Sequence, residues 1–223
     1  TATTEIYTLS LHDALPIFYS PDSGTIMFDG KSIAGMKPYD ITRMRIARTF
    51  QNIRLMKNLS VLDNVKISFV SQTDYGLATS IFRLPAYFRQ EKDTEKKSMA
   101  LLKVFNLDGK KDEKAANLPY GEQRRLEIAR ALATNPKLLL LDEPAAGMNP
   151  QETQELTELI RWIREKFHIA ILLIEHDMRL VMGVCEKIIV LDYGKIIAEG
   201  TPKEIQSNPK VIEAYLGEEA PHA

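Results

Sequence analysis

Residues 137–150 read KLLLLDEPAAGMNP, and this stretch decides the fold class. Four consecutive leucines, followed by two acids and a proline, predict a short strand buried in a parallel sheet. Two further apolar runs predict two more strands, IAILLIEHD at 169–177 and KIIVLDYG at 187–194. Three strands of this kind from residue 137 onward predict a sheet as the core.

Helices are predicted between these strands. The segment Gln151–Phe167 has apolar residues at the spacing i, i+3, i+4, i+7, which lines one helix face toward a sheet. These residues are Leu156, Leu159, Ile160 and Ile163. Met178–Val184 is predicted as a second helix. Strands that alternate with helices predict an α/β fold with a parallel, doubly wound sheet.

The stretch GTIMFDGKS at 24–32 ends as a phosphate-binding P-loop does, but its spacing is wrong. Five residues separate the two glycines, whereas the motif G-x-x-x-x-G-K-[ST] has four. Asp29-Gly30 is instead typical of a two-residue hairpin turn, so we predict strands at Thr25–Phe28 and Lys31–Ile33. GKIIAEG at 194–200 predicts the return strand of a second hairpin.

Helical signals dominate the middle of the chain. A short helix is predicted after Pro38, carrying Arg43, Arg45 and Arg48. Residues from about 60 to 135 have few strand signals and predict a helical lobe. Ser60 and Asp63 have the spacing of a capping box at its start. TPKEI and NPKVIEAYLG, near the end of the chain, predict terminal helices with a proline close to the start of each.

Composition restricts the class of protein. The net charge is −1 at pH 7, which argues against a general nucleic-acid binder. The single cysteine, Cys185, excludes an internal disulfide and a cysteine-rich zinc site, and we expect it to be buried. The longest apolar runs are too short to span a bilayer, so a membrane role is expected to require a partner.

Polar residues follow two of the predicted strands where each strand ends. Asp142 and Glu143 follow the first, and Glu175 and His176 follow the second. Open α/β sheets bind ligands at the carboxyl ends of their strands. An acid after a buried strand is also common at a structural helix cap, so the acidic pair alone has two explanations. The histidine one strand later favours a functional site.

Four motifs in a fixed order resemble the ATP-binding cassette of ABC transporters. They are RTFQ at 48–51, LPYGEQRRLEIARAL at 118–132, LLLLDEPAAGMNP at 138–150 and LLIEHD at 172–177. The resemblance runs from about Phe18 to the C-terminus and is closest to the branched-chain amino acid importers of bacteria. It implies an α/β, P-loop NTPase fold of ABC type, with a parallel sheet core, β-hairpins and a helical subdomain at about 60–135.

The resemblance also implies residue roles, with ATP and Mg²⁺ as cofactors. Gln51 resembles the Q-loop glutamine, which reaches the Mg²⁺ and the attacking water. Asp142 resembles the Walker B aspartate that holds Mg²⁺ through water. Glu143 resembles the residue that polarises the attacking water, and His176 the histidine near the γ-phosphate. Without the flanking motifs, Gln51 and His176 would be ordinary surface and structural residues.

The segment Leu118–Gln123 resembles the signature loop, which contacts ATP held by a second ATP-binding subunit. Gly121 would let the backbone approach a phosphate, at the positive end of the following helix. Glu122 and Asn149, the latter in the D-loop, stand at nucleotide-contacting positions. The departures from the usual Leu-Ser-Gly-Gly-Gln are Pro119, Tyr120 and Glu122. The proline removes a hydroxyl donor, and Glu122 adds negative charge near an anion.

The resemblance breaks at the start of the chain. Residues 1–17, TATTEIYTLSLHDALPI, stand where a cassette carries its P-loop, and we expect them to match nothing in the family. We interpret them as translated adapter DNA joined to a truncated gene, so that residues 18–223 form an N-terminally incomplete domain. A divergent natural N-terminus is the alternative. Without the P-loop lysine, weak Mg-ATP binding and no hydrolysis are expected.

The expected function is that of an ATPase subunit that energises amino acid import. The implied partners are transmembrane permease subunits and a second ATP-binding subunit, as a homodimer or heterodimer, with no nucleic acid. The implied location is the cytoplasmic face of the inner or plasma membrane, reached through the permease. A nucleotide-free, ABC-like interaction module is the alternative. A chromosome or repair ATPase is disfavoured because no long heptad-bearing insertion is present.

Overall fold

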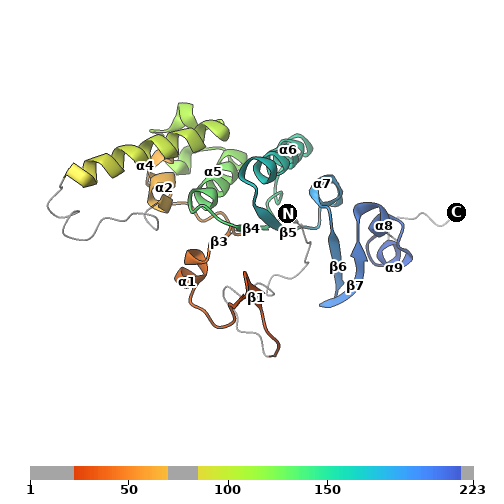
Figure 1. Ribbon diagram of the computed structural model, residues 1–223. Helices are drawn as coiled ribbons and strands as arrows, with labels where there is room; N and C mark the ends of the chain where they lie inside the picture. The colour runs from red at the N-terminus through yellow and green to blue at the C-terminus, as the bar shows by residue number, and fades with distance from the viewer. Residues whose placement is uncertain (1–22, 70–84, 217–223) are drawn as a thin grey trace. The chain divides into compact units, whose positions relative to one another are not determined.

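The computed structural model describes residues 23–69 and 85–216 (Figure 1). The chain divides into two units. The first contains the chain up to Gln51 and from Lys137 onward, and the second contains residues 52–136. The predicted boundary at residue 18 and the interpretation of residues 1–17 lie outside the described residues.

A three-stranded parallel sheet forms the centre of the first unit. Its strand order is β3 (Ile46–Arg48), β4 (Leu138–Asp142), β5 (Ala170–Ile174). Leu138 pairs with Ile46 on one side and with Ala170 on the other. The strand has neighbours on both edges, and its leucines 139–141 are buried. The predicted parallel α/β core is therefore confirmed.

Strand β3 replaces a predicted helix. Helix α1 (Pro38–Arg43) ends before Arg45, whose φ of 68° turns the chain out of the helix. The Arg45 carbonyl accepts hydrogen bonds from the backbone N–H groups of Lys137 and Leu138, which start the ladder with β4. The prediction that Arg45 and Arg48 lie on a helix is wrong. Pairing with β4 and burial of Ile46 and Ala47 outweigh the local helical signal.

Two predicted helices follow the strands of this sheet. Helix α6 (Pro150–Phe167) buries Leu156, Ile160 and Ile163, as its spacing predicts, and leaves Leu159 half-buried. Helix α7 (Met178–Val184) has the predicted bounds and is capped by Asp177. The Arg161 Nε of α6 donates to the carbonyl of Gly183 in α7 at 2.8 Å, which joins the two helices.

Two hairpins and short helices complete this unit. In the first hairpin β1 (Met27–Phe28) pairs with β2 (Lys31–Ser32), and Asp29 and Gly30 have φ of 51° and 74°. Positive φ at both turn residues is the geometry predicted for Asp-Gly, so the hairpin is confirmed with shorter strands. An apolar cluster packs the hairpin and α1 onto the sheet; its buried members are Ile33, Ile41, Ile46, Leu140 and Ile174.

The third predicted strand of the core differs from expectation. β6 (Ile188–Asp192) pairs only with β7 (Lys195–Gly200), antiparallel, among the described residues. The second hairpin is confirmed, but β6 does not extend the β3-β4-β5 sheet. No described strand pairs with the second edge of β5. The terminal helices are α8 (Pro202–Gln206) and α9 (Pro209–Val211), which continues as a π-helical turn (Ile212–Leu216).

The second unit is helical. It contains α2 (Val61–Ser68), α4 (Pro85–Val104) and α5 (Tyr120–Ala133), with 3₁₀ turns at Asp108–Lys110 and Ala115–Asn117. The Ser60 hydroxyl oxygen accepts the backbone N–H of Asp63 and caps α2. Helix α2 packs against both α4 and α5. The buried apolar side chains of this unit include Val61, Val65, Leu102, Phe105 and Leu126.

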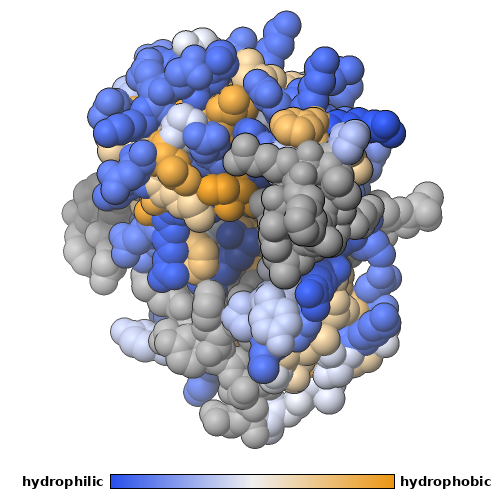
Figure 2. Space-filling view, turned by 90° about the vertical axis from the view of Figure 1, so that its left-hand side faces the viewer, coloured by the Kyte–Doolittle hydropathy of each residue, from blue (hydrophilic) through white to orange (hydrophobic). Residues whose placement is uncertain are grey.

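The surface mixes polar and apolar residues, as the space-filling view of one face shows (Figure 2). Large apolar side chains exposed in the second unit include Met56, Ile67 and Phe88. None of the helices in the described part of the chain combines the length and the hydrophobicity needed to cross a bilayer.

Candidate functional site

Asp142, the last residue of β4, forms an ion pair with Arg48, the last residue of β3. The Arg48 Nη2 lies 2.7 Å from the Asp142 Oδ2. Both side chains are nearly buried, with 12% and 8% of their surfaces exposed. The Asp142 N–H donates to the hydroxyl oxygen of Thr49 at 3.3 Å. Parallel register thus brings the ends of both strands together, with a cation directly against the predicted magnesium ligand.

Arg48 was not among the predicted site residues. The predicted helix gave no reason to pair Arg48 with β4, whereas strand β3 runs beside β4 and its last side chain reaches Asp142. Its guanidinium also lies 5.4 Å from the centre of the Phe50 ring. Three residues are too short a run to show a strand period, so the sequence around the RTFQ motif carries no clear signal for β3.

Glu143 lies directly after β4 and has an unusual backbone conformation. Its φ is 41°, and its N–H donates to the carbonyl of Ile174 at 2.9 Å, which fixes it to the end of β5. A positive φ at a residue other than glycine costs on the order of 1 kcal/mol or more. The Gln51 Nε2 donates to the Glu143 Oε2 at 2.7 Å. The strained turn therefore aims the carboxylate at the residue predicted as its functional neighbour.

His176 lies on the other side of the Glu143 carboxylate. The His176 Nδ1 is 3.8 Å from the Glu143 Oε1. The imidazole is 70% exposed, whereas the Glu143 side chain is only 13% exposed. Glu143 thus has one oxygen facing Gln51 and one facing an open imidazole. These three predicted residues form one cluster, and Asp142 precedes Glu143 in the chain.

The buried Glu175 side chain binds backbone N–H groups next to this cluster. One of its carboxylate oxygens accepts the N–H of Ala145 at 2.8 Å. The other accepts the N–H groups of His176 at 2.9 Å and Asp177 at 3.2 Å. Its side chain is almost completely buried, because these N–H groups replace water around its charge. Glu175 therefore fixes the loop after β5 to the turn after β4.

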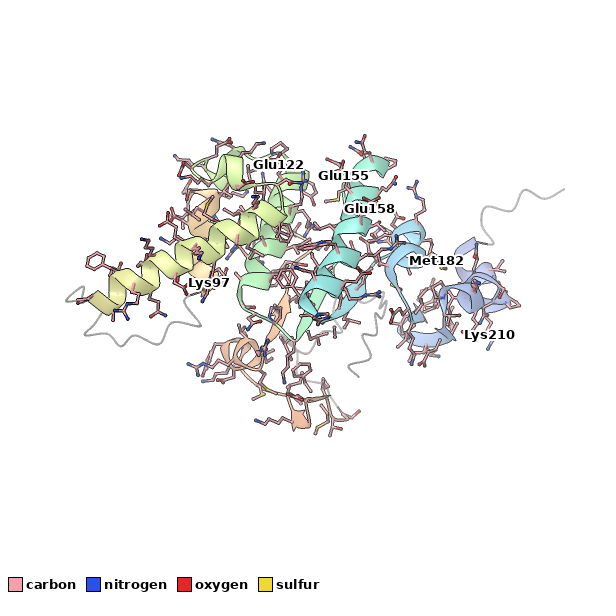
Figure 3. The ribbon with its side chains drawn as sticks, turned by 45° about the horizontal axis from the view of Figure 1, so that its top comes forward. Lys97, Glu122, Glu155, Glu158, Met182 and Lys210 are labelled. Atoms are coloured by element: carbon pink, nitrogen blue, oxygen red, sulfur yellow. The ribbon has the colours of Figure 1, made fainter. Side chains whose placement is uncertain are left out.

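The predicted signature residues lie in the helical unit, at the start of α5. Gly121 is the second residue of this helix, and Glu122 is the third (Figure 3). The Lys110 Nζ contacts both carboxylate oxygens of Glu122, at 2.7 and 2.8 Å. The extra negative charge expected at Glu122 is therefore neutralised by a residue twelve positions upstream. Lys110 carries no local sequence signal for this role.

Asn149 forms the cap of α6. Its side-chain oxygen accepts the N–H of Glu152 at 3.0 Å, and its own N–H donates to the Glu152 carboxylate at 2.9 Å. This reciprocal pair is a capping box. The structure thus gives Asn149 a clear structural role, and its contact with a nucleotide stays a prediction.

Two family models match parts of this chain. The family model described as "ABC transporter" matches residues 10–146, more than half of the chain. This chain belongs to the ABC transporter family. A second model, "Branched-chain amino acid ATP-binding cassette transporter", matches residues 195–221. The first match begins upstream of Phe18, so the family resemblance starts earlier than predicted. The natural or artificial origin of residues 1–17 stays a prediction.

Relatives within this family have long matches. The "High-affinity branched-chain amino acid transport ATP-binding protein LivG" of Salmonella typhimurium is 43% identical over 209 residues, which cover 94% of this chain and 82% of LivG. BraF of Pseudomonas aeruginosa, with the same description, is 41% identical over the same shares of each chain. A crystal structure of the ADP conformation of an ATP-binding cassette of an ABC transporter has a TM-score of 0.78 at 30% identity. That match covers 96% of this chain and 88% of the solved one.

ABC transporter cassettes bind ATP or ADP, and the donors near Asp142 can be tested for a fit to Mg²⁺. No group of three or more His, Cys, Asp or Glu residues suited to a metal ion exists among residues 23–69 and 85–216. Mg²⁺ needs no such cage, because it keeps several waters and is held by one or two carboxylates and by phosphates. Asp142 and Gln51 supply hard oxygen atoms and fit this mode of binding. The Arg48 guanidinium shares the Asp142 carboxylate with any such ion.

Proposed function

We propose that this chain is the ATP-binding subunit that energises import of branched-chain amino acids by an ABC transporter. Identities of 41–43% to LivG and BraF over most of the chain support the class of solute. One observation carries the activity: the Glu143 carboxylate is held between the Gln51 amide and the His176 imidazole at the ends of adjacent strands. Phosphoryl transfer depends on such positioning rather than on covalent chemistry with the protein.

Each residue of the cluster has a role in this proposal. Glu143 orients the attacking water and accepts its proton through a carboxylate oxygen. Gln51 holds the other side of that carboxylate in place and contacts the site of the metal and water. The exposed imidazole of His176 is free to approach the terminal phosphate. Asp142 is the carboxylate that holds the hydrated Mg²⁺, which neutralises phosphate charge when bound.

The helical unit supplies a second, complementary surface. The N–H groups at the start of α5 are not used within the helix, and together with the helix dipole they favour an anion. Gly121 adds no side chain there, and Lys110 cancels the charge of Glu122. We propose that this end of α5 contacts ATP bound by a second ATP-binding subunit, with Asn149 near the same interface. The dimer, identical or mixed, would attach to permease subunits at the cytoplasmic side of the membrane.

The sequence of residues 1–223 contains no G-x-x-x-x-G-K-[ST] motif. We propose that this polypeptide alone binds Mg-ATP weakly and does not hydrolyse it. The carboxylates of Asp142 and Glu143 repel phosphate, and the lysine and N–H cradle that hold the phosphates in a P-loop are not supplied by this sequence.

Calorimetry on two proteins tests this proposal. One is the 223-residue chain, and the other carries a LivG-type N-terminal segment with a P-loop in place of residues 1–17. We expect micromolar ATP affinity and ATPase activity only in the second protein. Glu143→Gln in that protein should retain ATP and lower kcat by about 10² to 10⁴-fold, as loss of a general base does. Micromolar ATP binding by the unmodified chain would contradict the weak-binding proposal.

A nucleotide-free, ABC-like regulatory module is the second candidate. Its support is the Arg48–Asp142 ion pair, which neutralises the Walker B aspartate without any metal. The same two proteins distinguish the candidates. If the P-loop version neither binds nor hydrolyses ATP although it folds, the module is favoured and the ATPase proposal fails.

A further inference from the structure

The loop after Gln51 is held by side chains of helix α5. The backbone N–H of Arg54 donates to the Glu127 Oε1 at 3.1 Å. The backbone carbonyl of the same residue accepts a hydrogen bond from the Arg130 Nη1. Glu127 and Arg130 are three residues apart on α5, so they lie on one face of the helix. One residue of the loop is therefore held at both of its backbone polar groups.

Further hydrogen bonds connect Glu127 to the start of α5. The Arg124 Nη1 donates to the Glu127 Oε2 at 2.8 Å, so both oxygens of this carboxylate are used. Arg124 is fully buried, and Glu127 is 5% exposed. The Arg124 Nη2 donates to the hydroxyl oxygen of Tyr120 at 3.2 Å. A continuous set of contacts thus joins Tyr120, in the signature loop, to the backbone of Arg54.

Neither a helix nor a strand explains this contact, because residues 53–56 are irregular backbone. The Glu127 carboxylate is buried, and a buried carboxylate is costly to leave without a partner. Arg54, whose backbone it binds, is an exposed residue. Burial lowers the pKa of the Arg130 guanidinium, and the nearby Glu127 carboxylate opposes that effect. Two charged side chains, Glu127 and Arg130, bind the backbone of an exposed loop residue. We infer from this that the position of the loop matters for function.

We propose that Glu127 is a positioning residue that ties the chain segment after Gln51 to the signature helix. Only Asn52 and Ile53 separate Gln51 from the held residue. The attachment therefore restricts the chain immediately after Gln51. The consequence for catalysis rests on the role proposed for Gln51, but the attachment itself does not. This contact also explains why a tyrosine stands where the family usually has glycine. The Tyr120 hydroxyl accepts a hydrogen bond from Arg124, and the Arg124 guanidinium carbon lies 5.9 Å from the centre of the Tyr120 ring.

Amide hydrogen exchange of the 223-residue chain, measured by NMR, tests the attachment without ATP. Glu127→Met removes the acceptor for the Arg54 N–H, and we expect this amide to exchange about 10-fold faster, as loss of a hydrogen bond to a charged group implies. Glu127→Gln keeps an acceptor oxygen and should give a smaller increase. Asp93→Asn is the matched control, since it removes a carboxylate of an exposed pair with Lys97 on α4 (Figure 3).

A double variant separates positioning from stability. Glu127→Met removes the carboxylate that faces the buried Arg124 guanidinium, so the single variant should also be less stable overall. Arg124→Met combined with Glu127→Met removes both charges, which often restores stability. We expect the double variant to recover its unfolding midpoint while the Arg54 amide stays about 10-fold less protected.

Two results would overturn the proposal. One is an unchanged exchange rate of the Arg54 amide in the folded double variant. The other, in the same double variant, is an equal rise in exchange across the whole 52–136 unit, which would show a purely structural role. A P-loop version that fails to hydrolyse ATP would defeat the proposed function and leave these exchange results unaffected.

Discussion

The Arg48 guanidinium and the Asp142 carboxylate lie 2.7 Å apart at the ends of adjacent parallel strands. The two residues are 94 positions apart in the sequence. Their ion pair is nearly buried, and it places a positive charge against the carboxylate that we propose as the Mg²⁺ ligand. Arg48 thus holds the Asp142 carboxylate in a defined position at the end of β4.

Replacing Arg48 with methionine should destabilise the protein. Asp142 would remain nearly buried without its partner, and removal of one member of a buried ion pair costs about 3 kcal/mol in the free energy of unfolding. Urea denaturation measures this change. Lys97→Met, which breaks an exposed pair with Asp93, is the control and should leave the midpoint unchanged. Equal effects of the two substitutions would show that the Arg48–Asp142 pair contributes no more to the free energy of unfolding than an exposed pair does.

Glu175→Gln should loosen the loop that carries His176. The amide NH₂ of glutamine would face a backbone N–H that now donates to a carboxylate oxygen. Loss of a hydrogen bond to a charged, buried group lowers stability by about 2 kcal/mol. The expected result is a lower unfolding midpoint in urea. Glu158→Gln on the exposed side of α6, labelled in Figure 3, should change nothing, and a stable Glu175→Gln variant would contradict the bracing role.

Lys110→Met should weaken the interaction of the N-terminal end of α5 with ATP in the P-loop version of the protein. Glu122 would keep its negative charge at the site where we propose that a phosphate binds. We expect kcat/KM for ATP to fall about 10-fold, which corresponds to roughly 1.4 kcal/mol. Adding Glu122→Gln should recover most of the loss, because the charge is then absent. Failure of this second change to restore activity would exclude charge neutralisation as the role of Lys110.

Cys185 should be unreactive in the folded protein. Burial raises the pKa of its thiol from 9.0 to about 12, so the neutral thiol is strongly favoured at pH 8. A folded pKa above the unfolded one stabilises the protein fully below pH 9, and this stability is lost as the pH rises toward 12. A thiol-specific disulfide reagent at pH 8 should label the chain only in denaturant. Rapid labelling of the native chain would show that Cys185 is accessible.

The sequence by itself determined the local elements and the type of chemistry. The Asp29-Gly30 hairpin, the bounds of α7 and the buried face of α6 follow from turn chemistry and apolar spacing, which act over a few residues. The acids and imidazole after β4 and β5 follow from the rule that parallel strands end at one edge. Motif order then indicated the family that the comparisons show.

Only the tertiary structure decided which of these residues touch. It turned residues 46–48 into a strand, paired Arg48 with Asp142, and placed Lys110 on Glu122. Within the described ranges it paired β6 with β7 alone, and it attached Arg54 to α5. These contacts join residues far apart in the chain, and they depend on strand register and helix packing. Local sequence patterns carry no information on either, because the free energy of such contacts comes from partners outside the local segment.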